Sequence, residues 1–146
     1  MEQTNPLEPV RFMIVDDDDI SAMAIERAIK KLKIANPVVM AKNGVEALEI
    51  LEQSKNNDGK LPRYIVTLDL NMPMMGGLEF LEHIRNDQSF RKLIVFVLTT
   101  SDAPDDIASA YDQNIAGYIV KENPTETFKE ALNMLSDYSQ LVVLPS

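Results

Sequence analysis

Acidic and other polar side chains directly follow several of the apolar runs in this sequence. Asp16 and Asp17 come at the end of one run, and Asp69 comes at the end of another. Thr99 and Lys121 follow two more. If these runs are strands of one parallel sheet, their carboxyl ends share an edge, where ligands of open α/β sheets gather. The sequence therefore predicts that carboxylates, a hydroxyl and an ammonium group meet at one edge of a sheet.

The acidic members of this group predict a cation site. Two unit charges about 4 Å apart repel by roughly 4 kcal/mol at an effective dielectric constant near 20. A divalent cation relieves that repulsion, and Mg²⁺ prefers carboxylate, carbonyl and water oxygens. The alternative is that the run Asp16–Asp19 only caps a helix and faces water, which we expect of its last two residues. That alternative does not explain why acids end two neighbouring buried strands, so we predict that Asp16, Asp17 and Asp69 bind Mg²⁺.

Lys121 and Thr99 add the groups that a transferring phosphoryl group needs. Lys121 can approach Asp69 and offer positive charge to an anion bound there, and Thr99 can donate its hydroxyl. Each residue has an ordinary alternative, since a lysine at a strand end is usually solvated and threonine is a common strand former. Together with a cation they would offset the charge on the phosphoryl oxygens. A carboxylate nucleophile at this place would form an aspartyl phosphate.

Five short apolar segments are predicted to be the strands that position these groups. Their continuous, β-branched character is typical of strands covered on both faces. They are Arg11–Val15, Val38–Ala41 (the weakest of the five), Tyr64–Leu68, Leu93–Leu98 and Gly117–Val120. Stretches with helical periodicity alternate with them, at Ile20–Lys33, Glu46–Gln53, Leu78–Arg85, Asp105–Asp112 and Thr125–Leu135. This alternation predicts a doubly wound α/β fold with a parallel sheet and helices on both faces.

Three local features carry their own predictions. Asp19 is the expected N-cap of the first helix. The Gly76–Gly77 pair suits backbone with positive φ in the turn before the third helix. The polar connection Ser54–Arg63 is the longest in the chain and is predicted to be a mobile surface loop.

Composition limits the classes of protein that fit. The chain has 146 residues, which is the usual size of one domain. Its 23 acidic and 14 basic residues give a net charge of −9, which argues against a nucleic-acid binder because phosphate rewards clustered cations. The absence of Cys excludes disulfides and thiolate metal sites, and the single His excludes a multi-histidine site. No signal-peptide pattern and no apolar run of membrane-spanning length is present, so we expect a cytoplasmic protein without a membrane partner.

Four segments resemble the receiver domain of two-component response regulators. They are FMIVDD, VTLDLNMPMMGG, FVLTTS and GYIVK, and they stand in that family's order and spacing. Each segment alone is a weak signal, whereas four in register are specific. The resemblance runs from about Arg11 to Leu135 and implies a five-stranded flavodoxin-like sheet of order 2-1-3-4-5. It also implies a receiver domain at residues 11–136, between tails at 1–10 and 137–146.

The resemblance assigns a role to each candidate site residue. Asp69 matches the phosphoacceptor. The other matches are Asp17 as a direct Mg²⁺ ligand, Asp16 acting mainly through metal-bound water, the backbone carbonyl of Asn71 as a further ligand, Thr99 as the switch hydroxyl, Tyr118 as the aromatic switch residue and Lys121 as the partner of the phosphoryl oxygens. For Tyr118 the alternative is that a strand tyrosine simply packs.

One position departs from the family pattern. The family lysine is commonly followed by proline, often through a cis bond, whereas Glu122 and Asn123 stand between Lys121 and Pro124 here. A cis bond to a residue other than proline costs roughly 3–4 kcal/mol, so we expect a different loop geometry.

The resemblance implies a signalling function rather than an enzyme. Asp69 would accept a phosphoryl group from a sensor histidine kinase or a histidine phosphotransfer protein, and Thr99 and Tyr118 would shift a conformational equilibrium. Because the sequence leaves no room for an output domain, we expect a stand-alone receiver. Its output would be contact with a downstream protein, phosphorelay or action as a phosphate sink. A homodimer is a further alternative for its oligomeric state.

Two other functions remain as alternatives. A haloacid-dehalogenase-like phosphatase would use an Asp nucleophile after the first strand and an acid two residues later, which Asp16 and Asp18 satisfy superficially. The chain offers no cap domain for such an enzyme. A receiver fold with an idle site is the second alternative, and the complete set of site residues argues against it.

Overall fold

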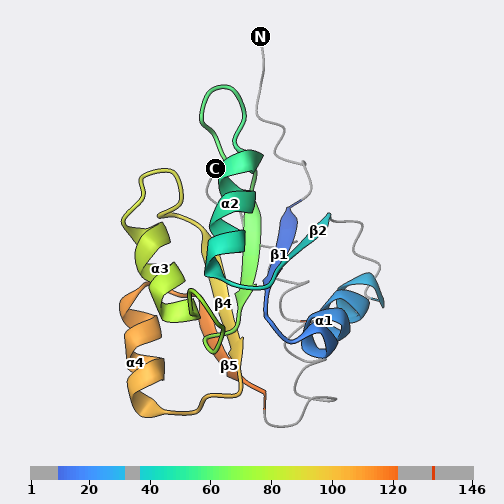
Figure 1. Cartoon of the computed structure of the whole chain (residues 1–146), viewed down its shortest axis with the longest axis vertical. Helices are drawn as coiled ribbons and strands as arrows, with labels where there is room; N and C mark the ends of the chain where they lie inside the picture. The colour runs from blue at the N-terminus through green and yellow to red at the C-terminus, as the bar shows by residue number, and fades with distance from the viewer. Residues whose placement is uncertain (1–9, 32–36, 122–132, 134–146) are drawn as a thin grey trace.

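Five strands and four helices alternate along the part of the chain that the structure describes (Figure 1). The computed structural model describes residues 10–31, 37–121 and 133. The elements are β1 (Arg11–Val15), α1 (Asp19–Lys31), β2 (Val38–Ala41), α2 (Gly44–Ser54), β3 (Tyr64–Leu68), α3 (Gly77–Arg85), β4 (Ile94–Thr99), α4 (Pro104–Asp112) and β5 (Gly117–Val120). The five predicted strands and the first four predicted helices are all present. The predicted helix Thr125–Leu135 and both tails lie almost wholly outside the described residues.

The strands form one sheet of order β2-β1-β3-β4-β5, and every neighbouring pair is parallel. The flavodoxin-like order implied by the resemblance is therefore confirmed. Val15 stands opposite both Ala41 and Leu68, and Thr99 stands opposite Val120. The carboxyl ends of the strands consequently lie at a common edge, as the sequence predicted.

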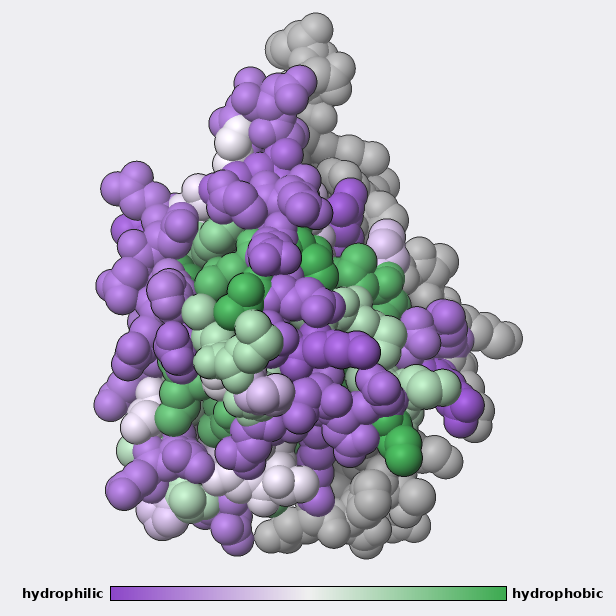
Figure 2. Space-filling view, viewed as in Figure 1, coloured by the Kyte–Doolittle hydropathy of each residue, from purple (hydrophilic) through white to green (hydrophobic). Residues whose placement is uncertain are grey.

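Helices cover both faces of this sheet (Figure 1), because alternate strand side chains point to opposite sides. One face packs on α2, α3 and α4 through buried residues that include Met13, Val66, Leu68, Val97, Leu51, Phe80, Ile84 and Ala110. The other face packs on α1 through Phe12, Ile14, Ile65, Phe96, Leu98, Ala22, Ile25 and Ile29. Burying one such large apolar side chain contributes roughly 1.5–3 kcal/mol. Figure 2, viewed as in Figure 1, shows hydrophobic residues toward the middle of this side of the molecule and hydrophilic residues over much of the rest.

Asp18, not Asp19, caps α1. The backbone N–H of Ile20 donates to Oδ1 of Asp18 at 3.0 Å, and the carbonyl of Asp18 accepts from the N–H of Ala22 at 2.9 Å. Asp19 is the first helical residue and is exposed. The specific prediction for Asp19 is wrong by one residue, while the expectation that one of the two acids caps and the other faces water is confirmed.

The prediction of positive φ at the Gly76–Gly77 pair is also wrong. Gly76 has φ of −74° and Gly77 begins α3, whereas Met74 carries the positive φ of 66°. Gly77 is needed for a different reason. A Cβ atom there would lie 2.5 Å from the carbonyl oxygen of Asp69, so only glycine allows α3 to begin this close to the end of β3.

The connection between α2 and β3 lies on the surface. Residues 56–60 are exposed, and the side chain of Asn56 accepts hydrogen bonds from the N–H groups of Asp58 and Lys60 at 2.9 and 3.0 Å. Gly59 has φ of +75° in this turn. The surface location is confirmed, and its mobility stays a prediction. Among the described residues, no helix has the length and apolar character needed to cross a membrane.

Candidate functional site

The sheet itself holds the first residue after three of its strands. The backbone N–H of Asp16 donates to the carbonyl of Ala41 at 3.0 Å, and that of Asp69 donates to the carbonyl of Val15 at 2.9 Å. The N–H of Lys121 donates to the carbonyl of Thr99 at 2.8 Å. The strand hydrogen-bonding pattern thus extends by one residue, and rigid backbone rather than a loose loop positions the predicted chemical groups.

Asp69 lies at the centre of this edge and accepts two hydrogen bonds on one carboxylate oxygen. The Thr99 hydroxyl donates to Oδ1 of Asp69 at 2.8 Å, and the backbone N–H of Asn71 donates to the same atom at 3.2 Å. Thr99 is fully buried, so its hydroxyl has a fixed environment. These contacts leave Oδ2 of Asp69 as the oxygen that faces Lys121, at 3.9 Å.

Burial raises the pKa of the Asp69 carboxyl above its ordinary value, because desolvation disfavours the charged form. Hydrogen bonds from Thr99 and Asn71 and the positive charge of Lys121 lower this pKa, and the negative charge of Asp16 raises it further. Desolvation is the largest of these effects.

Two further carboxylates lie beside that of Asp69. One oxygen from each of Asp16, Asp17 and Asp69 lies within 4.8 Å of the others. Asp16 is buried, Asp69 is partly buried and Asp17 is exposed, so the cluster opens toward solvent on one side. Such an all-oxygen set fits a hard divalent cation that keeps several waters. Asn71 is exposed at the rim, and the role of its carbonyl as a ligand stays a prediction.

Lys121 pairs most closely with Asp16 rather than with Asp69. Its Nζ lies 2.8 Å from Oδ2 of Asp16, and the two side chains are only 10% and 2% exposed. The same Nζ donates to Oγ of Ser21 at 2.8 Å. Sequence reasoning missed Ser21. Its position in the first turn of the helix that follows the acidic run is the signal that could have found it.

Tyr118 and Thr99 are linked through the loop that follows β4. The phenol of Tyr118 donates to the carbonyl of Ser101 at 2.8 Å, and the N–H of Ser101 contacts Oγ1 of Thr99 at 3.4 Å. The Ser101 hydroxyl in turn bonds the carboxylate of Asp106 in the first turn of α4. Burial raises the pKa of the Tyr118 phenol above its ordinary value. Hydrogen bonds thus link Thr99 through Ser101 to β5 and α4.

The loop after Lys121 lies outside the described residues, and with it the Lys121–Glu122 bond. No cis peptide bond occurs among the residues that the structure does describe. The different loop geometry expected at Glu122 therefore stays a prediction.

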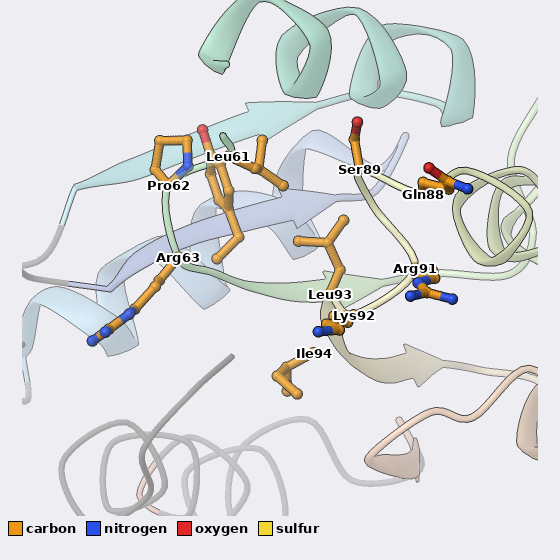
Figure 3. Close-up of a pocket in the computed structure, with 10 residues that line it drawn as sticks. Leu61, Pro62, Arg63, Gln88, Ser89, Arg91, Lys92, Leu93 and Ile94 are labelled. Carbon is orange, nitrogen blue, oxygen red and sulfur yellow. The ribbon is translucent and has the colours of Figure 1, made fainter. Parts of the chain in front are cut away.

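A separate hollow of about 160 Å³ lies at the opposite edge of the sheet, between the segment before β3 and the loop before β4 (Figure 3). Arg63, Arg91 and Lys92 are among its lining residues. The Arg63 and Arg91 side chains point away from each other in Figure 3, so these charges do not converge on a common point. The hollow is not part of the Asp69 site.

Comparison with known proteins identifies the family. The model of the response regulator receiver domain matches residues 12–133, which is most of the chain. The chain belongs to the response regulator receiver domain family. The four receiver-like segments of the sequence all lie within the matched residues, and the observed fold matches that of solved response regulators.

Individual relatives support this assignment. The receiver is 31% identical over 131 residues to the probable methanogenesis regulatory protein FilR2 of Methanothrix harundinacea, covering 90% of this chain and 84% of that one. It is 26% identical over 146 residues to response regulator Rcp1 of Synechocystis, covering 99% and 98%. The crystal structure of the phosphorylated cyanobacterial phytochrome response regulator RcpA superimposes with a TM-score of 0.82 at 27% identity, covering 94% and 99%.

Family membership establishes the general activity. Receivers are signalling domains of two-component systems that are phosphorylated on an aspartate and contact histidine kinases or phosphotransfer proteins and downstream proteins. Receivers also bind Mg²⁺ or Mn²⁺ at an acidic pocket, and Rcp1 has been solved in a Mn²⁺-bound form. In this chain, Asp16, Asp17 and Asp69 form a cluster of aspartates.

Proposed function

We propose that Asp69 is the phosphoacceptor of this receiver and that its donor is a phosphohistidine of a sensor histidine kinase or a histidine phosphotransfer protein. The observation that carries the proposal is the environment of the Asp69 carboxylate. One oxygen accepts the Thr99 hydroxyl at 2.8 Å, the other faces Lys121 at 3.9 Å, and the carboxylate lies beside those of Asp16 and Asp17. The free oxygen is the nucleophile.

The chain's own residues orient and stabilise the transfer. Oδ2 of Asp69 forms a bond to phosphorus as the bond between phosphorus and the donor imidazole nitrogen breaks, and that nitrogen leaves with the electron pair. Thr99 holds Oδ1 and thereby fixes the rotation of the carboxylate. Lys121 supplies positive charge next to Oδ2, where negative charge gathers on the phosphoryl oxygens.

We propose Mg²⁺ as the cofactor, held by Asp16, Asp17, Asp69 and the carbonyl of Asn71. The cation offsets charge on the transferring phosphoryl group. The fit rests on the donor set, because the clustered oxygens are all of the hard type that Mg²⁺ prefers and the exposed side of the cluster leaves space for water.

The output of the receiver is proposed to be a shift between two conformations. Phosphorylation draws Thr99 toward the new phosphoryl oxygens, and its contact with Ser101 passes this movement to Tyr118 and α4. We propose that the receiver domain, residues 11–136, signals in the cytoplasm through contact with a downstream protein or through phosphorelay. It would promote only its own phosphorylation and dephosphorylation, without turnover of an external substrate.

Two contacts argue against the phosphatase alternative. Asp16, its required nucleophile, is 3% exposed and bonded to Lys121 at 2.8 Å. Asp18, its required general acid, accepts the N–H of Ile20 as the cap of α1. Neither carboxyl is therefore available for the role that the phosphatase mechanism gives it.

The test is incorporation of a phosphoryl group from acetyl phosphate in the presence of Mg²⁺, measured as a mass increase of the intact protein. We expect wild type and the exposed-loop control Asp58→Asn to be modified alike and Asp69→Asn to remain unmodified. Incorporation into Asp69→Asn at the wild-type level would overturn the proposal. Release of product from exogenous phosphate esters that depends on Asp16 and not on Asp69 would support the phosphatase instead.

A further inference from the structure

The ammonium group of Lys121 is held by more than the acidic residues of the site. A lysine ammonium has three N–H donors. In this structure Nζ of Lys121 lies 2.8 Å from Oδ2 of Asp16 and 2.8 Å from the hydroxyl oxygen of Ser21, so two of the three donors are used. Oδ2 of Asp69 is farther away, at 3.9 Å. Asp16 and Ser21 together thus hold the ammonium to one side of Asp69.

We propose that Ser21 is a positioning residue that holds Lys121 off Asp69 until the phosphoryl group arrives. This inference rests on the proposed function and adds a residue to it. The Ser21 hydroxyl accepts from Lys121 and so occupies a donor that would otherwise turn to Oδ2 of Asp69. That oxygen then stays open to a cation and to the incoming phosphorus atom.

The location of Ser21 suits this role. Asp18 fixes the start of α1, and Ser21 follows in the first turn of that helix, partly buried beside the end of β5. The helix backbone therefore sets the position of the hydroxyl, whereas Lys121 ends in a flexible four-carbon chain that follows its acceptors. Because the lysine side chain is only 10% exposed, water cannot readily replace a lost acceptor.

Loss of the hydroxyl would change the balance of charge contacts at Asp69. Asp16 would still hold the ammonium, and the freed N–H would turn toward Oδ2 of Asp69, the next carboxylate oxygen at 3.9 Å. A direct ion pair there would occupy Oδ2, the oxygen that we propose attacks phosphorus. A cation would then bind more weakly, because the ammonium would place positive charge closer to the Asp69 carboxylate.

The closing experiment compares Ser21→Thr with Ser21→Val, using calorimetry with Mg²⁺ alone. Threonine and valine have nearly the same shape and similar helix propensity, so they differ chiefly in the hydroxyl. We expect Ser21→Thr to bind Mg²⁺ within about twofold of wild type, and Ser21→Val to bind about fivefold more weakly, the effect of losing one ordinary hydrogen bond. Ser21→Ala provides a second variant without the hydroxyl, and Ser109→Ala on the exposed side of α4 controls for loss of a helix serine.

The lysine provides the decisive control. In a Lys121→Met background the difference between threonine and valine at position 21 should disappear, since the hydroxyl acts through the ammonium. Equal Mg²⁺ affinity of the two variants in the native background would overturn the inference, as would a difference that persists undiminished without Lys121. The phosphorylation of wild type and its loss in Asp69→Asn are measured separately, so failure of this inference and failure of the proposed function are distinguishable.

Discussion

The two edges of the central sheet use positive charge in opposite ways. At the carboxyl edge, Lys121 bonds side chains from other elements, Asp16 after β1 and Ser21 in α1. At the amino edge, Arg85 at the end of α3 bonds backbone carbonyls. Its guanidinium donates to the carbonyl oxygens of Gln113, Arg91, Leu93 and Asn114 at 2.6 to 3.2 Å. Lys121 thus binds side chains of the candidate site, whereas Arg85 joins three segments of the chain through their backbone.

This difference follows from the direction of parallel strands. Every strand of the sheet ends at the carboxyl edge, and side chains at the ends of β1, β3, β4 and β5 converge there. At the amino edge the chain enters the strands from loops, and the hollow there has diverging charges (Figure 3). Charge count alone does not reveal a site, because convergence on one point is also required.

The largest effect is expected from removing the positive charge of Lys121 at the carboxyl edge. Lys121→Met should slow phosphorylation by acetyl phosphate about a hundredfold, the usual cost of losing one charge-stabilising donor. Lys92→Met, an exposed lysine at the amino edge, should stay within about twofold of wild type. Initial rates of mass increase measure both. Similar slowing by the two variants would mean that overall charge, not placement, controls the reaction.

The second effect concerns metal affinity. Asp17 is exposed, so Asp17→Asn should leave the fold intact. It should weaken Mg²⁺ binding at least about tenfold, because mutation of even the residues that hydrogen-bond to metal ligands usually lowers metal affinity that much. Asp19→Asn, also exposed and two residues away, is the matched control. Calorimetric titration with Mg²⁺ separates the two, and unchanged affinity in Asp17→Asn would remove this residue from the site.

A third prediction concerns the amino edge. Arg85→Met should lower the free energy of unfolding by about 2 kcal/mol, because the carbonyl oxygens that accept hydrogen bonds from the guanidinium would lose their donor. The rate of phosphorylation should stay within about twofold. Urea unfolding and the acetyl phosphate assay measure the two quantities. A variant of normal stability and impaired phosphorylation would contradict the division between the two edges.

The fourth and smallest effect is a pH dependence of stability. Burial raises the pKa of Asp69 in the folded protein above its unfolded value, so ionisation of this group opposes folding. Its favourable contribution is present at low pH and is lost as the pH rises through the folded-state pKa. In Mg²⁺-free buffer, Asp69→Asn should therefore be more stable than wild type at neutral pH, and the difference should vanish in acid.

Thermal unfolding across a pH series measures this difference. Added Mg²⁺ should narrow it, because a cation that binds the native state stabilises wild type. An Asp69→Asn variant that is less stable than wild type at neutral pH without Mg²⁺ would contradict the predicted sign of the stability difference.

The sequence predicted the architecture and the meeting of Asp16, Asp69, Thr99 and Lys121 because both depend on continuous buried strands. Such strands are visible as apolar runs, and their ends are therefore known to within a residue. The contacts that were missed depend on tertiary detail. Four consecutive aspartates offer equivalent caps, so the choice of Asp18 over Asp19 could not be made from residue type.

Other details depend on distances that no local pattern contains. Gly77 is required by the approach of α3 to the carbonyl of Asp69, not by its φ angle. The hydrogen bond between Lys121 and Ser21 joins residues 100 positions apart, and the preference of Lys121 for Asp16 over Asp69 is a matter of about one ångström.

The central claim is that the carboxyl edge directs phosphoryl transfer to one oxygen of one residue. Its most direct test is to phosphorylate the full chain with acetyl phosphate and Mg²⁺, reduce the acyl phosphate with borohydride and locate the reduced residue by mass spectrometry of peptides. The account predicts that Asp69 alone is converted to homoserine. Conversion of Asp16 or Asp17 with Asp69 intact would contradict it.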